Sequence, residues 1–227
     1  MRIAFVTAHP DDAEIYAGGL IGAWRRMGAS VSILIASDGA KGGTGDPAAL
    51  ASRRADEAQA GAALLGAEVM LLGHPDGGLE TAPDLPADLQ ARLIALAPDL
   101  VLTHGPMDYH ADHRALARIT QAAVSFRMPL VWLDTMMGVG QVPTHIIDTT
   151  ADQDLKDRAI RCHASQDPER FVQQTRLQAR FRAAQCGHDG FAEALRHDPV
   201  FPFSDIRALL PPPPPLRPVR DRNAPTG

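Results

Sequence analysis

Short apolar runs alternate with longer helical patterns over the first 133 residues, and this alternation constrains the fold more than any other feature. Residues 2–7 form an apolar, partly β-branched run. Residues 14–27 follow as a helix that Gly28 ends, and residues 31–36 form the next apolar run. This order predicts a βαβ unit. Runs that are apolar on both faces and separated by helices favour a parallel sheet covered on both sides.

The same alternation continues along the chain. Further strands are predicted at residues 68–72, 100–103, 130–133 and 145–148, and further helices at residues 47–65, 85–96, 112–126, 151–165 and 168–185. We therefore predict an α/β, Rossmann-like three-layer fold with a mostly parallel sheet and helices on both faces. Ligands of such sheets bind beyond the carboxyl ends of the strands, so a site is expected in the loops that follow them.

Length and composition indicate how the chain is divided. The 227 residues suffice for one sizeable core, and we predict a single domain over residues 1–208. Five consecutive prolines, residues 211–215, cannot continue a helix or a strand ladder. The proline-rich segment 209–227 is therefore predicted to be an extended or disordered tail.

Charge and cysteine content exclude several classes of partner. The formal charge of −5 leaves no global basic field to hold nucleic acid. No apolar run approaches the ~18 residues that a bilayer span requires, and the first six residues do not form a signal peptide. Only Cys162 and Cys186 are present, which fits a reducing compartment. A cytoplasmic protein without a nucleic-acid partner or membrane span is expected, and a homo-oligomer is left open.

The first strand runs directly into Ala8-His9-Pro10-Asp11-Asp12. A nucleotide-binding fold would place a glycine-rich turn here, whereas two carboxylates repel phosphate and suit a cation. Pro10 fits the first turn of a helix, and His9 and Asp12 lie three residues apart, on a common face. An imidazole and a carboxylate together are a zinc-binding pair.

A third ligand is expected at another strand end, because catalytic zinc takes three protein ligands and keeps one position open. After strand 100–103, His110 and His113 again lie three residues apart. One of them suffices as a ligand, and the other could act as an acid or an electrostatic stabiliser. Asp112 could fix the tautomer of an imidazole. Each motif alone is common at ordinary helix starts, but the two together at strand ends of one sheet favour a metal site.

His74-Pro75-Asp76 is similar to the first motif but differs after it. Two glycines follow, in place of a second acid and a helix. A turn at the rim of the site is therefore favoured over metal ligation.

At this point the motifs resemble those of a known family. Residues 8–14 with Gly18-Gly19 resemble the first motif of the PIG-L and LmbE-like de-N-acetylases, zinc hydrolases that remove acyl groups from amino sugars. Residues 110–113 resemble their second motif. Further matches, in order, are residues 37–39, 54–57, 72–77 and 163–166, so that the resemblance covers about residues 2 to 200.

The resemblance implies a role for each matching residue. His9, Asp12 and His113 are expected to bind Zn²⁺, for which Fe²⁺, Co²⁺ or Mn²⁺ could substitute. Asp11 is expected to act as the general base, His110 as the acid or oxyanion partner, and Asp112 as the residue that orients His110. Zinc lowers the pKa of a bound water from 15.7 to about 7 and polarises an amide carbonyl.

The substrate is less well defined by the sequence. Arg54 aligns with a residue that contacts the sugar, and Asp38 and His74 contribute to a polar rim suited to hydroxyl groups and a small acyl group. Two departures from the family pattern are visible. Ala111 stands where proline is commoner, and the loop 134–143 carries no Arg or Lys that could anchor a charged substrate.

We therefore expect a metal-dependent amide hydrolase that removes an acetyl group from an N-acetylated amino sugar, such as an N-acetylglucosaminyl conjugate. Alternatives are an amidase that cleaves a sugar thiol conjugate or another amide, and a non-catalytic sugar-binding protein on the same fold. The retained base and acid argue against the non-catalytic alternative, because binding alone requires neither. The missing glycine-rich turn disfavours a nucleotide-binding module.

Overall fold

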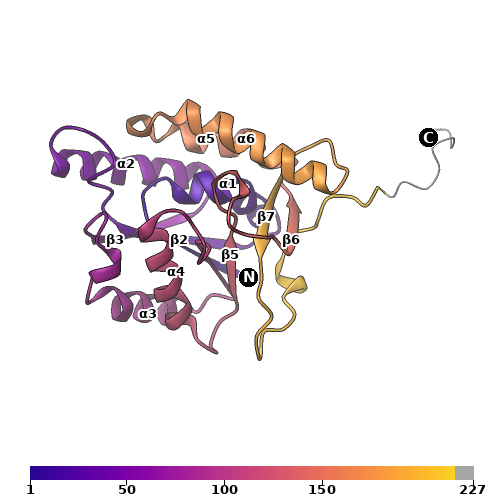
Figure 1. The fold of residues 1–227 in the computed structure, drawn as a ribbon, viewed down its shortest axis with the longest axis horizontal. Coiled ribbons are helices and arrows are strands. Elements are labelled where there is room, and N and C mark those ends of the chain that lie inside the picture. The colour runs from indigo at the N-terminus through magenta and orange to yellow at the C-terminus, as the bar shows by residue number, and fades with distance from the viewer. Residues whose placement is uncertain (218–227) are drawn as a thin grey trace.

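A seven-stranded sheet runs through residues 1–217, the part of the chain that this computed structural model describes (Figure 1). The strands are β1 (Arg2–Thr7), β2 (Ser30–Ser37), β3 (Glu68–His74), β4 (Leu100–Thr103), β5 (Leu130–Leu133), β6 (His145–Asp148) and β7 (Ala192–Arg196). Their order is β3-β2-β1-β4-β5-β7-β6. The first five pair in parallel, and β7 is antiparallel to both β5 and β6. The predicted, mostly parallel sheet is confirmed.

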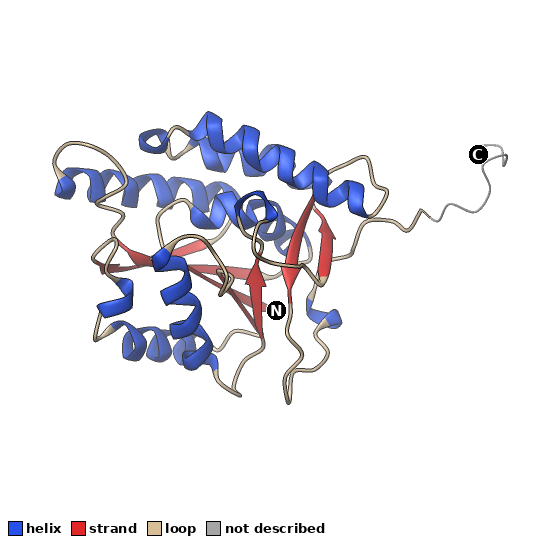
Figure 2. Ribbon diagram, viewed as in Figure 1, coloured by secondary structure: helices blue, strands red, loops and turns tan. Residues whose placement is uncertain are grey.

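Helices cover both faces of this sheet, as predicted (Figure 2). They are α1 (Asp12–Arg26), α2 (Pro47–Leu65), α3 (Leu85–Leu96), α4 (Ala111–Val124), α5 (Gln153–Arg161) and α6 (Pro168–Gln185). Helices α1, α2, α5 and α6 lie on one face, and α3 and α4 lie on the other. Successive strand residues point to opposite sides: Phe5 belongs to the core beneath α1, and Val6 to the core beneath α3 and α4.

Two elements differ from the sequence prediction. Strand β7 was not expected, because Ala-Glu-Ala-Leu-Arg is rich in good helix formers and becomes a strand only through its pairing with β5 and β6. The helix expected over residues 151–165 is shorter. Its α-helical part is α5, and short 3₁₀ turns at Thr150–Asp152 and Ala164–Gln166 flank it.

Contacts with the domain continue past residue 208. The indole Nε1–H of Trp24 donates to the carbonyl of Leu209 (2.8 Å), and the backbone N–H of Asp148 donates to the carbonyl of Pro212 (3.2 Å). The side chain of Leu210 belongs to the core beneath α1. The tail at 209–227 stays a prediction, and its residues 218–227 lie outside the described part of the chain. None of the helices within residues 1–217 combines the length and apolarity needed to cross a membrane.

The strand order determines where a ligand can bind. Strand β1 lies between β2 and β4, so the chain leaves β1 toward one neighbour and later returns to the other. Loops that leave the carboxyl ends of β1 and β4 therefore diverge and open a crevice between them. The motif at residues 8–12 follows β1 and the motif at residues 110–113 follows β4, so both predicted halves of the site reach this crevice.

Candidate metal centre

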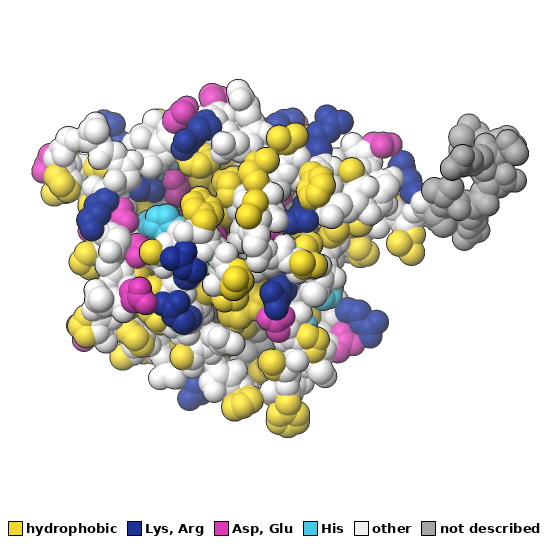
Figure 3. Space-filling view, in the orientation of Figure 1, with side chains coloured by type: hydrophobic (Ala, Val, Ile, Leu, Met, Phe, Trp, Pro, Cys, Tyr) yellow, Lys and Arg dark blue, Asp and Glu magenta, His cyan; other side chains and the backbone are white. Residues whose placement is uncertain are grey.

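A pocket of about 370 Å³ opens at this crevice. The turn after β1 and the start of α4 form its floor. The loops after β2 and β3 line one part of the wall, and Tyr109, the loop after β5 and helix α6 line another part. The residues that line it are His9, Asp11, Asp12, Ile15, Tyr16, Lys41, Gly42, Arg54, Asp76, Gly77, Tyr109, His110, His113, Met136 and Phe171. Figure 3 shows a histidine side chain at the surface, with acidic and basic side chains beside it.

The three residues predicted to bind the metal converge on the floor. His9 Nδ1 lies 3.2 Å from His113 Nε2, and Asp12 Oδ2 lies 3.4 Å from each of these nitrogens. All three side chains are buried. The local spacing brings His9 and Asp12 together, and the β1–β4 pairing brings His113 to them. The structure thus brings together all three predicted ligands.

The dimensions of this triangle fit a tetrahedral ion. Ligand bonds of 2.0–2.2 Å around tetrahedral zinc place neighbouring ligand atoms about 3.3–3.6 Å apart. The observed separations of 3.2–3.4 Å are close to that edge, and all three residues line the pocket. Two nitrogens and one carboxylate oxygen form a donor set typical of a catalytic zinc site.

Carboxylates surround His9 on its other side as well. Its Nε2 lies 3.3 Å from Asp76 Oδ1 and 3.5 Å from Asp112 Oδ2. Burial lowers the pKa of His9, but hydrogen bonding with Asp112, Asp12 and Asp76 outweighs it and raises the pKa to about 12. The carboxylates around His9 therefore stabilise a positive charge at the floor of the pocket, and a bound cation would supply that charge.

Asp112 differs from its expected role. Its carboxylate accepts hydrogen bonds from the backbone N–H groups of Gly77 (2.7 Å) and Leu79 (3.3 Å) and faces His9. Only its backbone N–H reaches His110. Asp112 lies in the first turn of α4, and its carboxylate points toward the turn after β3. Asp112 therefore supports the ring of His9 and does not orient that of His110.

His113 has a carboxylate partner that sequence reasoning did not assign. Its Nδ1 lies 3.2 Å from Asp108 Oδ2, which leaves Nε2 directed at the metal triangle. Burial lowers the pKa of His113, but Asp12 and Asp108 outweigh it and raise the pKa to about 9. Asp108 occurs in the loop after β4, five residues before its partner, and a carboxylate there is the only sequence signal.

His104 is a second residue that the sequence prediction left without a role. It follows β4 directly, and its ring stacks on that of His113 with centroids 3.7 Å apart. Its Nε2 lies 3.2 Å from Asp12 Oδ2 but accepts a hydrogen bond from the backbone N–H of Ala8 (3.0 Å). Burial, reinforced by His113, lowers the pKa of His104 to about 4. His104 is thus a neutral imidazole that stacks on His113, and the backbone N–H of Ala8 occupies its Nε2 lone pair.

Asp11 lies beside the triangle and has a different partner. Its Oδ2 lies 3.2 Å from Arg54 Nη2. Burial raises the pKa of Asp11 to about 6, and Arg54 limits that rise. Its backbone φ of +134° is one that side-chain-bearing residues rarely adopt, and such strain is typical of functional turns. The carboxyl group is therefore ionised at neutral pH and able to accept a proton.

Arg54 has protein partners for its guanidinium. Its Nη2 donates to the carbonyl of Pro10 (2.8 Å) and its Nη1 to the carbonyl of Gly39 (3.0 Å). The side chain is buried, although it lines the pocket. The guanidinium thus holds the turn at residues 10–11 to the glycine loop, and its contact with a sugar stays a prediction.

His110 begins helix α4 as its N-cap. Its Nδ1 accepts a hydrogen bond from the backbone N–H of Asp112 (3.2 Å), so a neutral ring carries its proton on Nε2. Burial, together with His113 and His9, lowers the pKa of His110. The cap thus fixes a tautomer with an N–H that can donate within the pocket.

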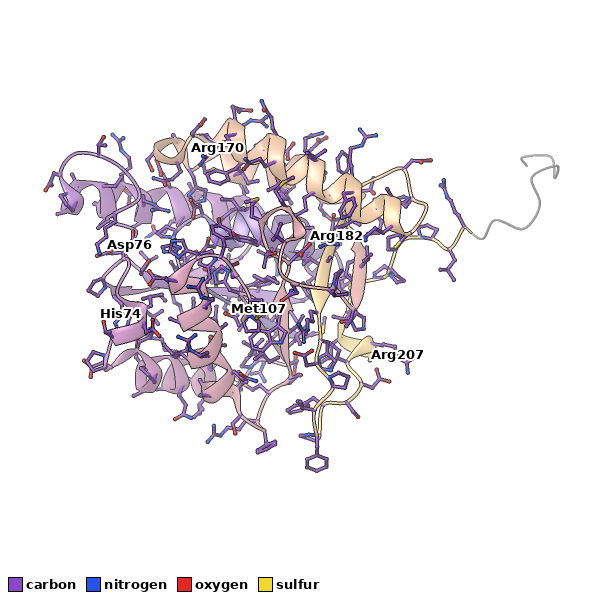
Figure 4. The ribbon with its side chains drawn as sticks, viewed as in Figure 1. His74, Asp76, Met107, Arg170, Arg182 and Arg207 are labelled. Atoms are coloured by element: carbon purple, nitrogen blue, oxygen red, sulfur yellow. The ribbon has the colours of Figure 1, made fainter. Side chains whose placement is uncertain are left out.

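The two remaining predicted residues, Asp38 and His74, do not line the pocket. Asp38 accepts hydrogen bonds from the backbone N–H groups of Ala40 (3.0 Å) and Asp76 (3.1 Å), so it joins two loops. His74 ends β3, lies below Asp76 in the view of Figure 4, and is not among the lining residues. Neither side chain supports the expected direct contact with substrate. Asp76, from the same turn as His74, reaches the pocket in its place.

Comparison with known proteins agrees with this arrangement. The PIG-L family, described as GlcNAc-PI de-N-acetylase, matches residues 4–124. The chain belongs to the PIG-L family. This match spans more than half of the chain and includes every residue of the metal triangle.

Individual relatives extend the likeness to most of the chain. Diacetylchitobiose deacetylase from Thermococcus kodakarensis is 28% identical over 235 residues, covering 90% of this chain and 88% of that protein. The structure of N,N'-diacetylchitobiose deacetylase from Pyrococcus horikoshii superposes with a TM-score of 0.77 at 26% identity, covering 89% of this chain and 87% of that one. GalB, a 4-carboxy-2-hydroxymuconate hydratase from Pseudomonas putida, has a TM-score of 0.76 at 25% identity, covering 89% and 97%.

Proposed function

We propose that this protein is a zinc-dependent hydrolase that removes an acetyl group from an N-acetylated amino sugar. The observation that carries the proposal is the triangle of His9, Asp12 and His113, whose ligand atoms are 3.2–3.4 Å apart, with Asp11 beside it in one pocket. Membership of the PIG-L family and likeness to two chitobiose deacetylases support the amide of an amino sugar as the bond that is cleaved.

His9 Nδ1, Asp12 Oδ2 and His113 Nε2 would hold the ion, which supplies Lewis acidity toward water and the amide carbonyl when bound. The carboxylates behind His9 and His113 orient these rings. Asp76 and Asp112 face His9 Nε2, and Asp108 faces His113 Nδ1. Such partners fix ring orientation and raise ligand basicity.

Asp11 takes the proton from the attacking water. Its pKa of about 6 lets it accept a proton near neutrality and later return that proton to the departing amine. The amine nitrogen must gain a proton before the C–N bond breaks, because an unprotonated amine anion is a poor leaving group.

His110 donates its Nε2–H to the oxygen on which negative charge develops. The family resemblance implies that His110 is either the acid or the oxyanion partner, and two observations favour the oxyanion partner. The ring accepts at Nδ1, and its lowered pKa keeps it neutral. A neutral imidazole is a hydrogen-bond donor to an oxyanion rather than a ready source of protons.

The size of the pocket favours a small substrate. A volume of about 370 Å³ lies near the lower end of the ~300–1,000 Å³ typical of small-molecule sites, which suits one sugar ring with a short substituent. A cytoplasmic location and a small-molecule sugar partner accompany the proposal.

A second candidate is a hydratase. The likeness to GalB favours it, because that hydratase has nearly the same TM-score as the deacetylase. The two reactions differ in their products: a deacetylase releases acetate and a primary amine, whereas a hydratase adds water to a double bond and releases neither.

The test is a panel of N-acetylated amino sugars and glycosides incubated with protein of measured metal content. Equal amounts of acetate and primary amine are expected from at least one N-acetylglucosaminide. Fully metallated protein that leaves all of them intact, while hydrating an unsaturated carboxylate or cleaving long-chain amides, would contradict the proposed function.

A further inference from the structure

Lysine is used sparingly in this chain, and both lysines have defined surroundings. Of 22 basic residues, 20 are Arg and two are Lys. Lys156 is buried and pairs with Glu193, with Nζ 2.6 Å from Oε1. Lys41 lies in the glycine loop and lines the pocket. The loop 134–143 holds no basic residue, so the pocket has no basic side chain from that loop beside Lys41.

The backbone beneath Lys41 is firmly held. The N–H of Lys41 donates to Asp76 Oδ2 (2.9 Å), and Asp38 ties the neighbouring Ala40 to the same turn. Arg54 donates to the carbonyl of Gly39 from the other side (3.0 Å). The loop therefore presents the Lys41 side chain from a fixed position, although the side chain itself is exposed.

The ammonium group lies over the turn that borders the metal floor. A Cβ built on Gly77 would lie 3.0 Å from Lys41 Nζ, so the ammonium covers that glycine. The preceding residue, Asp76, is the one that faces His9 Nε2 at 3.3 Å. Lys41 thus places a positive charge over the turn whose Asp76 faces His9.

Lys41 is also without a carboxylate partner. Within residues 1–217, two cations line the pocket, and Arg54 pairs with Asp11 while Lys41 forms no ion pair. Another part of the wall consists of Tyr109, Met136 and Phe171, which carry no positive charge. One part of the wall therefore offers an unpaired point charge, and the other offers apolar surface.

We propose that Lys41 determines specificity by binding an anionic group, a carboxylate or a phosphate, on the substituent attached to the N-acetylated sugar. This inference rests on the proposed function and adds to it a substrate class. An ammonium with three donors suits either anion. The apolar part of the wall would cover the sugar ring.

The test uses a matched pair of substrates that differ only in charge. These are the N-acetylglucosaminide of glycolic acid and its primary carboxamide. N-acetylglucosamine 1-phosphate is assayed beside them as a substrate that carries a phosphate. Wild-type protein is expected to prefer the acid in kcat/KM, and Lys41→Met is expected to lower the acid-to-amide ratio about tenfold, a modest value for a charged hydrogen bond at an exposed site. Lys41→Arg should keep most of the ratio.

Arg53→Met is the control, because Arg53 is exposed, precedes Arg54 and does not line the pocket. It should leave the ratio unchanged. If Lys41 only offsets the carboxylates of the floor, Lys41→Met slows both substrates equally, and an unchanged ratio overturns the inference. A wild-type protein without preference for either anion also overturns it.

Failure of the proposed function would be visible separately. If neither member of the pair loses its acetyl group, equilibrium binding of both to the zinc-loaded protein is measured instead. Lys41→Met must then weaken binding of the acid relative to the carboxamide about tenfold. An equal effect on both would overturn the role of Lys41 regardless of the reaction.

Discussion

The floor and the walls of the pocket are built differently. Each proposed metal ligand of the floor is buried and has a second contact: His9 with Asp76, Asp12 with the backbone N–H of His9 (2.7 Å), and His113 with Asp108. The walls end in side chains that solvent reaches, such as Lys41 and Tyr109, whose exposed fraction is 67%. Held geometry suits the chemistry, and exposed side chains suit recognition, which differs from substrate to substrate.

Changes to the floor are therefore expected to abolish activity, whereas changes to the walls are expected to alter selectivity. The largest effect is expected from His9→Ala and His113→Ala. Each removes one of three ligand atoms, so both variants should lose the bound metal and all measurable activity. Metal content and acetate release are measured on the same samples. His145→Ala in β6, away from the pocket, is the control. Full metal retention in both variants would refute the ligand assignment.

The next largest effect is expected from Asp11→Asn. The amide cannot accept a proton, so turnover should fall by roughly two to four orders of magnitude, the range typical of a positioned base. Metal content should be unchanged, because Asp11 pairs with Arg54 and is not one of the triangle's residues. Asp12→Asn should instead weaken metal binding. If Asp11→Asn emptied the site and Asp12→Asn did not, the two roles would have to be exchanged.

A smaller effect is expected from Asp108→Asn, which changes the support of the floor. Loss of the carboxylate that faces His113 Nδ1 should weaken metal binding about 10–100-fold. Added zinc should restore most of the turnover, because the three ligands remain. Asp154→Asn, at an exposed site on α5, is the matched control. A variant that binds metal as tightly as wild type would show that Asp108 does not support the ligand.

The smallest effect is expected from Arg54→Gln, and it is a shift in pH dependence. Asp11 is ionised above its pKa of about 6 and protonated below it, so wild-type kcat should fall as the pH drops through 6. Arg54 holds that pKa down, so its loss should move the acid limb upward by about one pH unit or more. The kcat profile is measured from pH 5 to 9. A higher KM with an unmoved acid limb would instead support the sugar contact.

The sequence predicted the part of the site that depends on local spacing. His9 and Asp12 share one turn of chain, and residues 110–113 open a helix, so their placement follows from the alternation of strands and helices. The parallel sheet then brings the two motifs to one crevice. For the same reason the strands β1 to β5 and the helices between them were predictable.

The contacts that the sequence did not predict join different loops. Asp76 reaches His9 because β3 and β1 lie on either side of β2, and Asp112 turns toward Gly77 because α4 begins beside that loop. Neither contact has a local sequence signal. Strand β7 was missed because its residues favour a helix, and only its neighbours in the sheet make it a strand.

The most direct test of the metal-dependent mechanism is a zinc titration of the metal-free protein, with acetate release from an N-acetylglucosaminide as the readout. Activity should be absent without metal and should rise linearly until one equivalent of zinc is bound per chain. Asp11→Asn should bind the same single equivalent and stay nearly inactive. Full activity of chelator-treated, metal-free protein would contradict the account, because no residue of the floor could then replace the ion.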